Sequence, residues 1–383
     1  MTNKRTPKKI NMKQKKEPKV ALTLIVKNEA KNIIECLNSM TGLYDHAFIT
    51  DTGSEDDTVA LLKKRRDVTV SHFEWIEDFA AARNYNLSQV PDEYDWVVWA
   101  DADDRVHATE EQRVEFRKRI GYMEAGGFTH ADFPYIYSHQ GQDIERGVPE
   151  FKYHRKRLFK RDACTWKGFI HEHPAVIGKG CKYNEPVWHH YRDGTGRMNT
   201  ERNLRIFEKK LKEMEGETLA RYTFYYAKEL TYNQKYDEAI KQFETYLPIS
   251  NLVPEKARAM YELGVLYRMR GDKEQATHYA NECLKIEPNN PDAHVLLSKT
   301  FYDDKNYAQA YWHAQRAVLT KDEQMAFFDY IPNRTWVPLE LMAWCKFQEG
   351  YVGDAIVFIK HAIEYNKNHP HLLATEEKFR KEL

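Results

Sequence analysis

The chain has few cysteines, no long apolar run and no net charge. Its five cysteines include no C-x-x-C pair, which argues against a zinc ribbon or a disulfide framework and is typical of a reducing compartment. No stretch approaches the roughly 18 consecutive apolar residues of a membrane span, and the first residues lack the apolar core of a secretory signal. Lys plus Arg and Asp plus Glu balance at 58 each, so no overall field favours nucleic acid. We therefore expect a cytoplasmic protein without a membrane span or a nucleic-acid partner.

The chain is long enough for two or three domains, and its 42% hydrophobic residues supply material for packed cores. Residues 1–19 are basic and poor in large apolar groups, which predicts a disordered tail. In residues 20–198, strand-like apolar runs alternate with segments of helical period, which predicts an α/β domain with a mainly parallel sheet covered on both faces. Within it, residues 128–191 show a pattern of short strands and turns. Residues 199–383 carry only helical patterns and are predicted to form an all-α domain.

A group of carboxylates follows one predicted strand of the α/β domain. The run 96–100 is typical of a buried strand, and Asp101-Ala102-Asp103-Asp104 comes directly after it. Carboxylates at the tip of a buried strand need a counter-charge, and Mg²⁺ and Mn²⁺ bind carboxylates together with phosphate oxygens. Open α/β sheets bind ligands beyond the carboxyl ends of their strands. The cluster therefore indicates a nucleotide-diphosphate ligand, with an ordinary acidic turn as the alternative. The other predicted strands are 20–26, 47–50 and 68–70.

Alanines recur at similar positions of the predicted helices after residue 199. Ala276 and Ala310 lie 34 residues apart, which is the tetratricopeptide period, whereas Ala239 and Ala355 lie at longer spacings. The pattern predicts four repeats with degenerate outer units, interrupted by the loop around 327–336; the alternative is a generic helical bundle. Repeat arrays present concave surfaces to extended partners, and self-association, for example as a homodimer, is the second role that we consider.

Four motifs occur in the first half of the chain: Leu24-Ile25-Val26-Lys27-Asn28-Glu29, Asp51-Thr52-Gly53-Ser54, Asp78-Phe79-Ala80-Ala81-Ala82-Arg83-Asn84 and Asp101-Ala102-Asp103-Asp104. They stand in the order found in family 2 glycosyltransferases, and the sequence resembles that family over residues 20–198. With its tetratricopeptide extension, it is similar to the branch that includes the peptide S-glycosyltransferases that modify bacteriocins. The resemblance implies a GT-A fold, which is a Rossmann-like nucleotide-diphospho-sugar transferase fold. It also implies a nucleotide-sugar donor, a divalent metal and inversion at the anomeric carbon.

Several polar residues are candidates for binding the donor. Asp51 ends a strand, where its carboxylate can accept the imide N–H of uracil, the role that the resemblance also implies; its rival role is to cap the following helix. Asn28 and Glu29 can line the same pocket, although a Glu near a helix N-terminus is also favoured by the helix dipole. Arg83 offers a planar fork for the diphosphate or for the acidic cluster, with Asp78 to orient it. A surface salt bridge is the alternative for Arg83.

The resemblance also assigns the metal ligands. Asp103 is the candidate for direct coordination of Mn²⁺ or Mg²⁺, and Asp101 for the ribose or a metal-bound water, following the D-x-D pattern of the family; Asp104 is the spare carboxylate. A histidine near the end of the catalytic domain often completes the metal shell in GT-A enzymes, and His189 lies where the resemblance places it. His190 points to the opposite face if this segment is a strand. Structural or solvent-facing histidines are the alternative.

A second similarity is to the G-x-[IV]-H-E segment of the same branch, carried by Trp166-Lys167-Gly168-Phe169-Ile170-His171-Glu172. Direct displacement at an anomeric carbon needs a base opposite the leaving diphosphate to take the acceptor's proton, and a carboxylate is the usual choice. Glu172 is our candidate for this base. His171 is the alternative base, or it orients Glu172 or contacts phosphate. A thiol acceptor, which is partly ionised near neutral pH, would need the base less than a hydroxyl.

Together with what the resemblance implies, these residues predict a metal-dependent inverting glycosyltransferase that moves a hexose or N-acetylhexosamine from a UDP-sugar to a protein or peptide. Two alternatives are transfer to a glycan or cell-surface saccharide, and an inactive nucleotide-binding scaffold with a repeat adaptor. The sequence leaves open the sugar, the acceptor and the acceptor atom, because each depends on a few pocket contacts.

Overall fold

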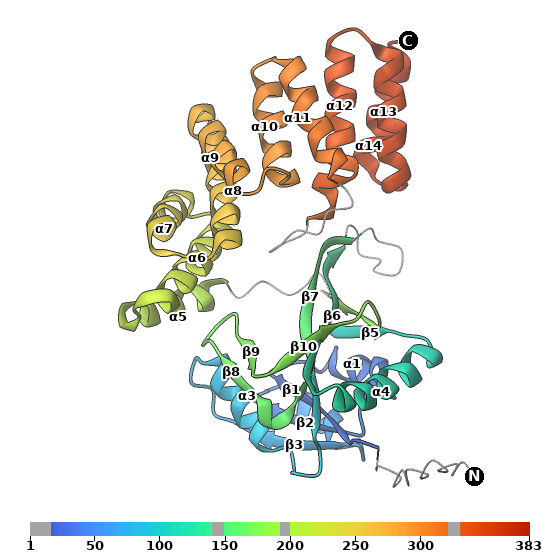
Figure 1. Ribbon diagram of the computed structural model, residues 1–383, viewed down its shortest axis with the longest axis vertical. Coiled ribbons are helices and arrows are strands. Elements are labelled where there is room, and N and C mark those ends of the chain that lie inside the picture. Colours follow the sequence, from blue (N-terminus) through green and yellow to red (C-terminus); the bar gives the residue numbers. More distant parts are fainter. Residues whose placement is uncertain (1–16, 140–148, 192–199, 321–329) are drawn as a thin grey trace, which may run out of the picture. The chain divides into compact units, whose positions relative to one another are not determined.

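The computed structural model describes residues 17–139, 149–191, 200–320 and 330–383, and they form two compact units (Figure 1). The sheet unit comprises the described residues of Met1–Phe133 and Arg155–Val187. The helical unit comprises those of Pro134–His154 and Trp188–Leu383. Most of the predicted basic tail and the predicted domain boundary at 198/199 lie outside the described residues.

Four parallel strands form the first half of the sheet unit, in the order β3-β2-β1-β4. Leu22 of β1 lies between Ala47 of β2 and Val98 of β4. Because these strands are hydrophobic runs, β1, β2 and β4 are almost wholly buried, as expected for a sheet covered on both faces. This part of the prediction is confirmed. The strands are β1 (Val20–Val26), β2 (His46–Asp51), β3 (Val68–His72) and β4 (Trp96–Trp99).

Helices alternate with these strands, as the sequence pattern predicts. Asp78 caps α3 by accepting a hydrogen bond from the Ala81 amide at 2.9 Å. Helix α4 begins with a capping box, in which Thr109 and Gln112 bond to each other's backbone amides. Helix α4 and the short strand β5 are not among the elements predicted from the sequence. The elements are α1 (Ile33–Ser39), α2 (Thr58–Leu62), α3 (Phe79–Ser88), β5 (Asp104–His107) and α4 (Glu110–Ala125).

Two strands of twelve residues, β6 (Phe128–His139) and β7 (Pro149–Lys160), follow α4. The prediction of only short strands in this region is wrong for both, because their mixed polar and aromatic sequences lack the continuous apolar run by which a buried strand is detected. β7 pairs antiparallel with β4, with Val97 opposite Phe159. The boundary between the two units crosses both strands. The elements that follow are η1 (Arg161–Ala163), β8 (Cys164–Lys167), β9 (His173–Val176), β10 (Lys179–Lys182) and β11 (Val187–His190).

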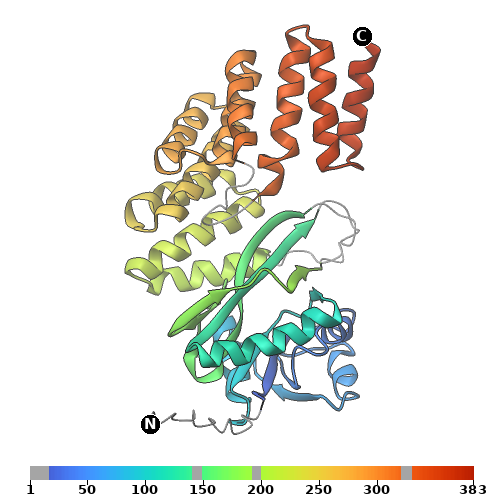
Figure 2. The ribbon, with the colours of Figure 1, turned by 45° about the vertical axis from the view of Figure 1, so that its right-hand side comes forward.

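The helical unit contains four successive helix pairs among its described residues (Figure 2). The four alanines singled out by their spacing each occupy the fourth position of the second helix of a pair, and all four are fully buried. Small residues there let paired helices approach closely, so the predicted array is confirmed. The pairs are α6 (Gly216–Tyr232) with α7 (Tyr236–Ile249), α8 (Val253–Met269) with α9 (Lys273–Ile286), α10 (Pro291–Asp303) with α11 (Tyr307–Leu319), and α12 (Trp336–Gln348) with α13 (Val352–Tyr365).

Shorter elements accompany the helix pairs. Phe151 of β7 forms an isolated bridge with Tyr330, and their rings lie 4.8 Å apart, so the end of β7 packs on the segment before α12. Of the predicted interrupting loop, residues 327–329 lie outside the described part of the chain. The remaining elements are α5 (Thr200–Lys210), η2 (Leu211–Glu213), η3 (Ile331–Arg334) and α14 (Pro370–Lys381).

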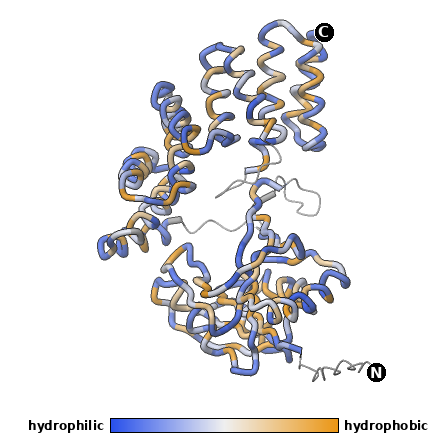
Figure 3. Tube along the Cα trace, viewed as in Figure 1, coloured by the Kyte–Doolittle hydropathy of each residue, from blue (hydrophilic) through white to orange (hydrophobic). Residues whose placement is uncertain are grey.

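Hydrophobic residues recur along the helices with hydrophilic residues between them (Figure 3). Each unit has buried clusters of its own, with Trp99, Phe159 and Trp166 in one cluster of the sheet unit and Phe224 and Phe243 in one of the helical unit. No helix within the described ranges is both long enough and apolar enough to cross a membrane.

Candidate functional site

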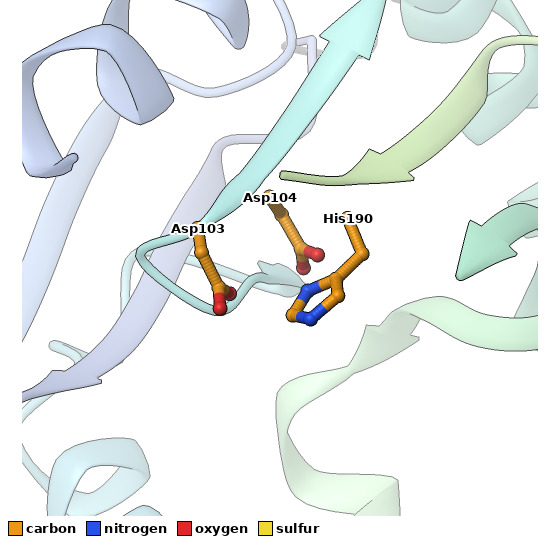
Figure 4. Close-up of side chains that lie close together, drawn as sticks. All are labelled: Asp103, Asp104 and His190. Carbon is orange, nitrogen blue, oxygen red and sulfur yellow. The ribbon is translucent and has the colours of Figure 1, made fainter. Parts of the chain in front are cut away.

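Three carboxylates lie in different surroundings between the end of β4 and the start of β5, and two of them, Asp103 and Asp104, are labelled in Figure 4. Asp104 is fully buried and pairs with the equally buried Arg157, with 2.8 Å between Oδ2 and Nη2. The same Oδ2 accepts a hydrogen bond from the Asp101 amide at 3.0 Å. Asp104 therefore holds the turn together from inside. Asp103 is half-buried, and its carboxylate offers an oxygen within 4.8 Å of one from Asp104.

Asp101 lies among cations. Its carboxylate accepts a short hydrogen bond from Arg83 Nη2 through Oδ1, and Oδ2 lies 3.7 Å from Arg155 Nη1. Burial opposes ionisation of Asp101, but the charges of Arg83, Arg155 and Arg157 outweigh it and hold its pKa well below the usual range. Asp101 is thus a permanently ionised, 32% exposed carboxylate at the tip of β4.

Arg83 joins the two predicted halves of the reaction site. Its Nε donates to Glu172 Oε1 at 2.7 Å, while Nη2 donates to Asp101. Its guanidinium lies 4.8 Å from the ring of Trp99 and 4.7 Å from that of Trp166. Of the interactions predicted for Arg83, the structure shows the one with the acidic cluster and not a surface salt bridge, since the side chain is only 6% exposed. Contact with a diphosphate stays a prediction.

Neighbouring residues of α3 fix the position of Arg83. The Asn84 side chain exchanges two hydrogen bonds with the Trp166 backbone, at 2.9 and 3.0 Å, as a neighbouring strand would. Asn86 donates to Phe48 O, also at 2.9 Å. These bonds attach α3 to β8 and β2. The suggestion that Asp78 orients Arg83 is wrong, because its carboxylate caps α3 instead.

Glu172 and His171, the two candidates for the base, follow β8. Glu172 is 14% exposed, and its Oε1 accepts the hydrogen bond from Arg83. His171 is exposed and has a φ of 50°, a left-handed conformation that non-glycine residues rarely adopt. The sharp turn at His171 directs the chain so that Glu172 reaches Arg83. Their catalytic roles stay predictions.

The loops after β1 and β2 are bonded to each other. The Asn28 amide donates to Ser54 Oγ at 2.9 Å, and Asn28 Oδ1 accepts from the Glu55 amide at 2.8 Å. Asp51, only 6% exposed, accepts from the Gly53 and Ser54 amides. Asp51 therefore shapes its own turn and does not cap α2, whose N-cap residue is Asp57. Uracil binding by Asp51 stays a prediction.

Glu29 belongs to the same negative region as the acidic turn. Its amide donates to Thr58 Oγ1 at 2.7 Å, and its carboxylate accepts from Asn32. Burial raises the pKa of Glu29, and the charges of Asp103 and Asp101 raise it further. A raised pKa caused partly by other carboxylates means that a bound cation would relieve repulsion here.

The two predicted histidines lie on β11, in the helical unit. His189 is in register with Ile136 of β6, and the ring of His190 stacks on Tyr137 at 4.9 Å. His190 is labelled in Figure 4 with the two aspartates. The metal-binding role of His189 stays a prediction.

Sequence reasoning did not single out Arg155, Arg157 and Trp99, although the structure places all three beside the acidic turn. The sequence did contain one hint. Arg155 and Arg157 are two residues apart, so in a strand both side chains lie on the same face. The pairing of β7 with β4 could not be predicted from the sequence, because it joins residues more than 50 positions apart.

Comparisons with known proteins find one family match in each half of the chain. Residues 22–115 match the family described as Glycosyl transferase family 2, and residues 257–290 match a tetratricopeptide repeat. The resemblance and the fold class predicted from the sequence, a GT-A domain followed by a helical repeat array, are thereby confirmed.

Among curated proteins, the SPbeta prophage-derived glycosyltransferase SunS of Bacillus subtilis (strain 168) is 27% identical over 231 residues, which cover 58% of this chain and 52% of SunS. The chain thus matches about half the length of that relative. A TPR repeat-containing protein of Synechococcus elongatus is 34% identical over 110 residues, or 29% of this chain and 26% of that protein. A crystal structure of MamA covers 44% of this chain and 90% of its own, with 15% identity and a TM-score of 0.37.

Proposed function

We propose that this protein is a metal-dependent inverting glycosyltransferase that transfers a sugar from a UDP-sugar to a protein or peptide. The observation that carries the proposal is the concentration of negative charge from Glu29, Asp101 and Asp103 at the ends of β1 and β4, beside the Arg83–Glu172 pair. The match to family 2 glycosyltransferases over residues 22–115 supports the reaction class.

The residues at the acidic turn fit a hard divalent cation. Carboxylate oxygens are the ligands that Mg²⁺ and Mn²⁺ prefer, and the charges of Asp103 and Asp101, which add to burial in raising the pKa of Glu29, favour a cation. In our proposal Asp103 coordinates the metal, Asp101 contacts the ribose or a metal-bound water, and His189 completes the shell. When bound, the metal would neutralise charge on the leaving diphosphate. Asp104, paired with Arg157, maintains the turn.

The donor would lie along the loops after β1 and β2. Asp51 would accept the imide N–H of uracil, and Asn28 would shape the same pocket by linking the two loops. Glu29 would border it next to the metal ligands. The bonds between the two loops preorganise this pocket before the donor arrives.

Glu172 would act as the base in a single displacement. The acceptor atom bonds to the anomeric carbon as the bond from that carbon to the phosphate oxygen breaks, and the electron pair leaves with UDP. The acceptor's proton passes to Glu172 Oε2, while Arg83 fixes the carboxylate through Oε1. His171, on the exposed side of the same turn, is the alternative proton acceptor.

The helical unit would present the acceptor. Its match to a tetratricopeptide repeat supports binding of an extended protein segment, and self-association is the other role considered. A protein or peptide acceptor would be met in the cytoplasm, where we place the protein. Transfer to a glycan is distinguished by separating labelled peptide and glycan fractions after the reaction.

The test is release of UDP from a panel of UDP-sugars with Mn²⁺ or Mg²⁺ present. We expect turnover with at least one donor, abolition by a chelator, and loss of at least about 100-fold in Asp103→Ala. Asp162→Ala, which removes an exposed carboxylate from η1, is the matched control and should keep full activity. Release that is insensitive to the chelator and to Asp103→Ala would refute the metal assignment, and no release with any donor would favour an inactive scaffold.

A further inference from the structure

Three arginines surround one indole ring beside the acidic turn. The guanidinium carbons of Arg83, Arg155 and Arg157 lie 4.8, 4.6 and 4.2 Å from the centre of the Trp99 ring. Their side chains are 6%, 25% and 0% exposed, respectively. The three arginines thus lie at similar distances from the Trp99 ring, but their side chains differ in exposure to solvent.

Two of these arginines are committed to carboxylates inside the protein. Arg157 pairs with Asp104, and neither side chain is exposed. Arg83 binds Asp101 and Glu172 at once, and Trp99 and Trp166 lie against its guanidinium. A diphosphate that took Nε or Nη2 of Arg83 would have to displace Glu172 or Asp101, which would leave that carboxylate without its partner.

Arg155 is placed differently. Its Nη1 lies 3.7 Å from Asp101 Oδ2, the oxygen that Arg83 does not contact, and a quarter of its side chain is exposed. It therefore borders the carboxylate that we assign to the ribose or a metal-bound water. Asp103 would hold the metal in our proposal, the metal would bind the donor's phosphates, and Arg155 borders the same acidic turn.

We propose that Arg155, and not Arg83, binds the diphosphate of the nucleotide donor. This inference rests on the proposed function and deepens it. The guanidinium fork matches two phosphate oxygens, and it supplies positive charge where charge develops as the bond to the anomeric carbon breaks. Trp99 supports the guanidinium from one face. Arg155 then holds the product UDP as well as the donor.

The neighbouring Lys156 provides a matched control. Successive side chains of a strand point to opposite faces, so Lys156 lies on the other face of β7 from Arg155. Consistent with this, the charge of Lys156 lowers the pKa of Cys164 and of His130. Arg155→Met and Lys156→Met each remove one cation from the same strand, and only the first removes it from the proposed site.

The experiment measures binding of UDP and of uridine, with Mn²⁺ present, to the full-length protein and its variants. We expect Arg155→Met to weaken UDP binding by about 10- to 100-fold and to leave uridine binding within about 3-fold, because uridine lacks the phosphates. Arg155→Lys should recover part of the loss, and Lys156→Met should bind both ligands as the parent protein does.

Three outcomes would overturn the inference. They are unchanged UDP binding by Arg155→Met, an equal loss for uridine and UDP, and weaker binding of Mn²⁺ alone. The last two would mean that Arg155 maintains the structure of the site. If the parent protein bound no UDP with Mn²⁺, the proposed function itself would fail, and that result differs from a parent that binds UDP and an Arg155 variant that binds it equally well.

Discussion

Arg83 connects the acidic turn to the proposed base, and this role depends on the shape of its side chain. A guanidinium can donate to Asp101 and Glu172 through different nitrogens at fixed angles, whereas the single ammonium of Lys cannot hold both carboxylates in the same directions. Arg83 is therefore a positioning residue in our proposal. Its effect should be visible in turnover and not in affinity for the donor.

We predict that Arg83→Lys lowers kcat by about 100-fold, the scale of a misplaced general base, while UDP affinity stays within about 3-fold. Steady-state kinetics and UDP titration measure the two quantities separately. Arg161→Lys, a matched change at an arginine that pairs with Asp92 and Asp162 in η1, should alter neither. A variant at position 83 that lost UDP affinity but kept kcat would show that Arg83 and not Arg155 contacts the phosphates.

At the scale of residues, the sequence identified the candidate site residues better than the contacts between them. The carboxylates of the acidic turn, Arg83 and Glu172 stood out because their side chains suit metal and proton chemistry in recognisable motifs. The Arg83–Glu172 contact joins residues 89 positions apart, and the buried Arg157–Asp104 pair depends on strand pairing. Such contacts form only when the sheet is folded, so no local sequence pattern predicts them.

At the scale of elements, α10 and α11 are joined by a buried pair of histidines. His294 Nδ1 and His313 Nδ1 lie 3.1 Å apart in a hydrogen bond, and the side chains are in contact with Phe301 and Trp312. Burial lowers the pKa of both, for His313 to about 4, with the neighbouring His294 as the further cause. Both imidazoles are therefore neutral in the folded protein near pH 7.

We predict that the helical unit loses stability as the pH falls from about 6.5 to about 4. The unfolded chain takes up a proton at His313 below the ordinary pKa of 6.5, while the folded chain does so only near 4, so the free energy of unfolding falls by roughly 1–3 kcal/mol across this window. Urea denaturation at several pH values measures it. In His313→Gln the pH dependence should be reduced, whereas His278→Gln, at an exposed histidine of α9, should keep it. Equal pH dependence in both variants would contradict this account.

The helices and strands that could be predicted differ from the others in the regularity of their sequences. Helix pairs were predictable because Ala276 and Ala310 share a spacing and a place in their helices. β6 and β7 were predicted too short because polar and aromatic residues are mixed along both strands, and neither contains a continuous apolar run. Their length is set by their strand partners, which include β4 for β7 and β10 and β11 for β6.

At the scale of the whole molecule, each unit has buried clusters of its own, and we expect a packing change between α8 and α10 to act independently of ligand binding at the acidic turn. Gly264 of α8 tests this independence. A Cβ added there would lie 2.6 Å from Leu296 Cδ2 and 3.2 Å from the Ala276 carbonyl oxygen, both in other helices of the same unit. The Ala276 carbonyl oxygen belongs to the backbone of α9 and therefore cannot easily move away from the added Cβ.

We predict that Gly264→Ala destabilises the helical unit by about 1–3 kcal/mol, as overpacking does, while UDP and Mn²⁺ bind as before. Calorimetric unfolding and UDP titration measure the two effects. Gly353→Ala in α13, where an added Cβ meets nothing within 4 Å, should be neutral or slightly stabilising. Loss of UDP binding in Gly264→Ala at a temperature where it remains folded would show that the units depend on each other.

Because β6 and β7 each contribute residues to both units, the chain passes between the units at 133/134, at 154/155 and at 187/188. The repeat array is therefore not a cassette that recombination could attach or exchange at a single junction. A fusion made after residue 198 would leave Phe151 in one parent and Tyr330 in the other, although their backbones pair. A chimera that keeps this contact therefore has to take residues 134–154 from the same parent as the repeats.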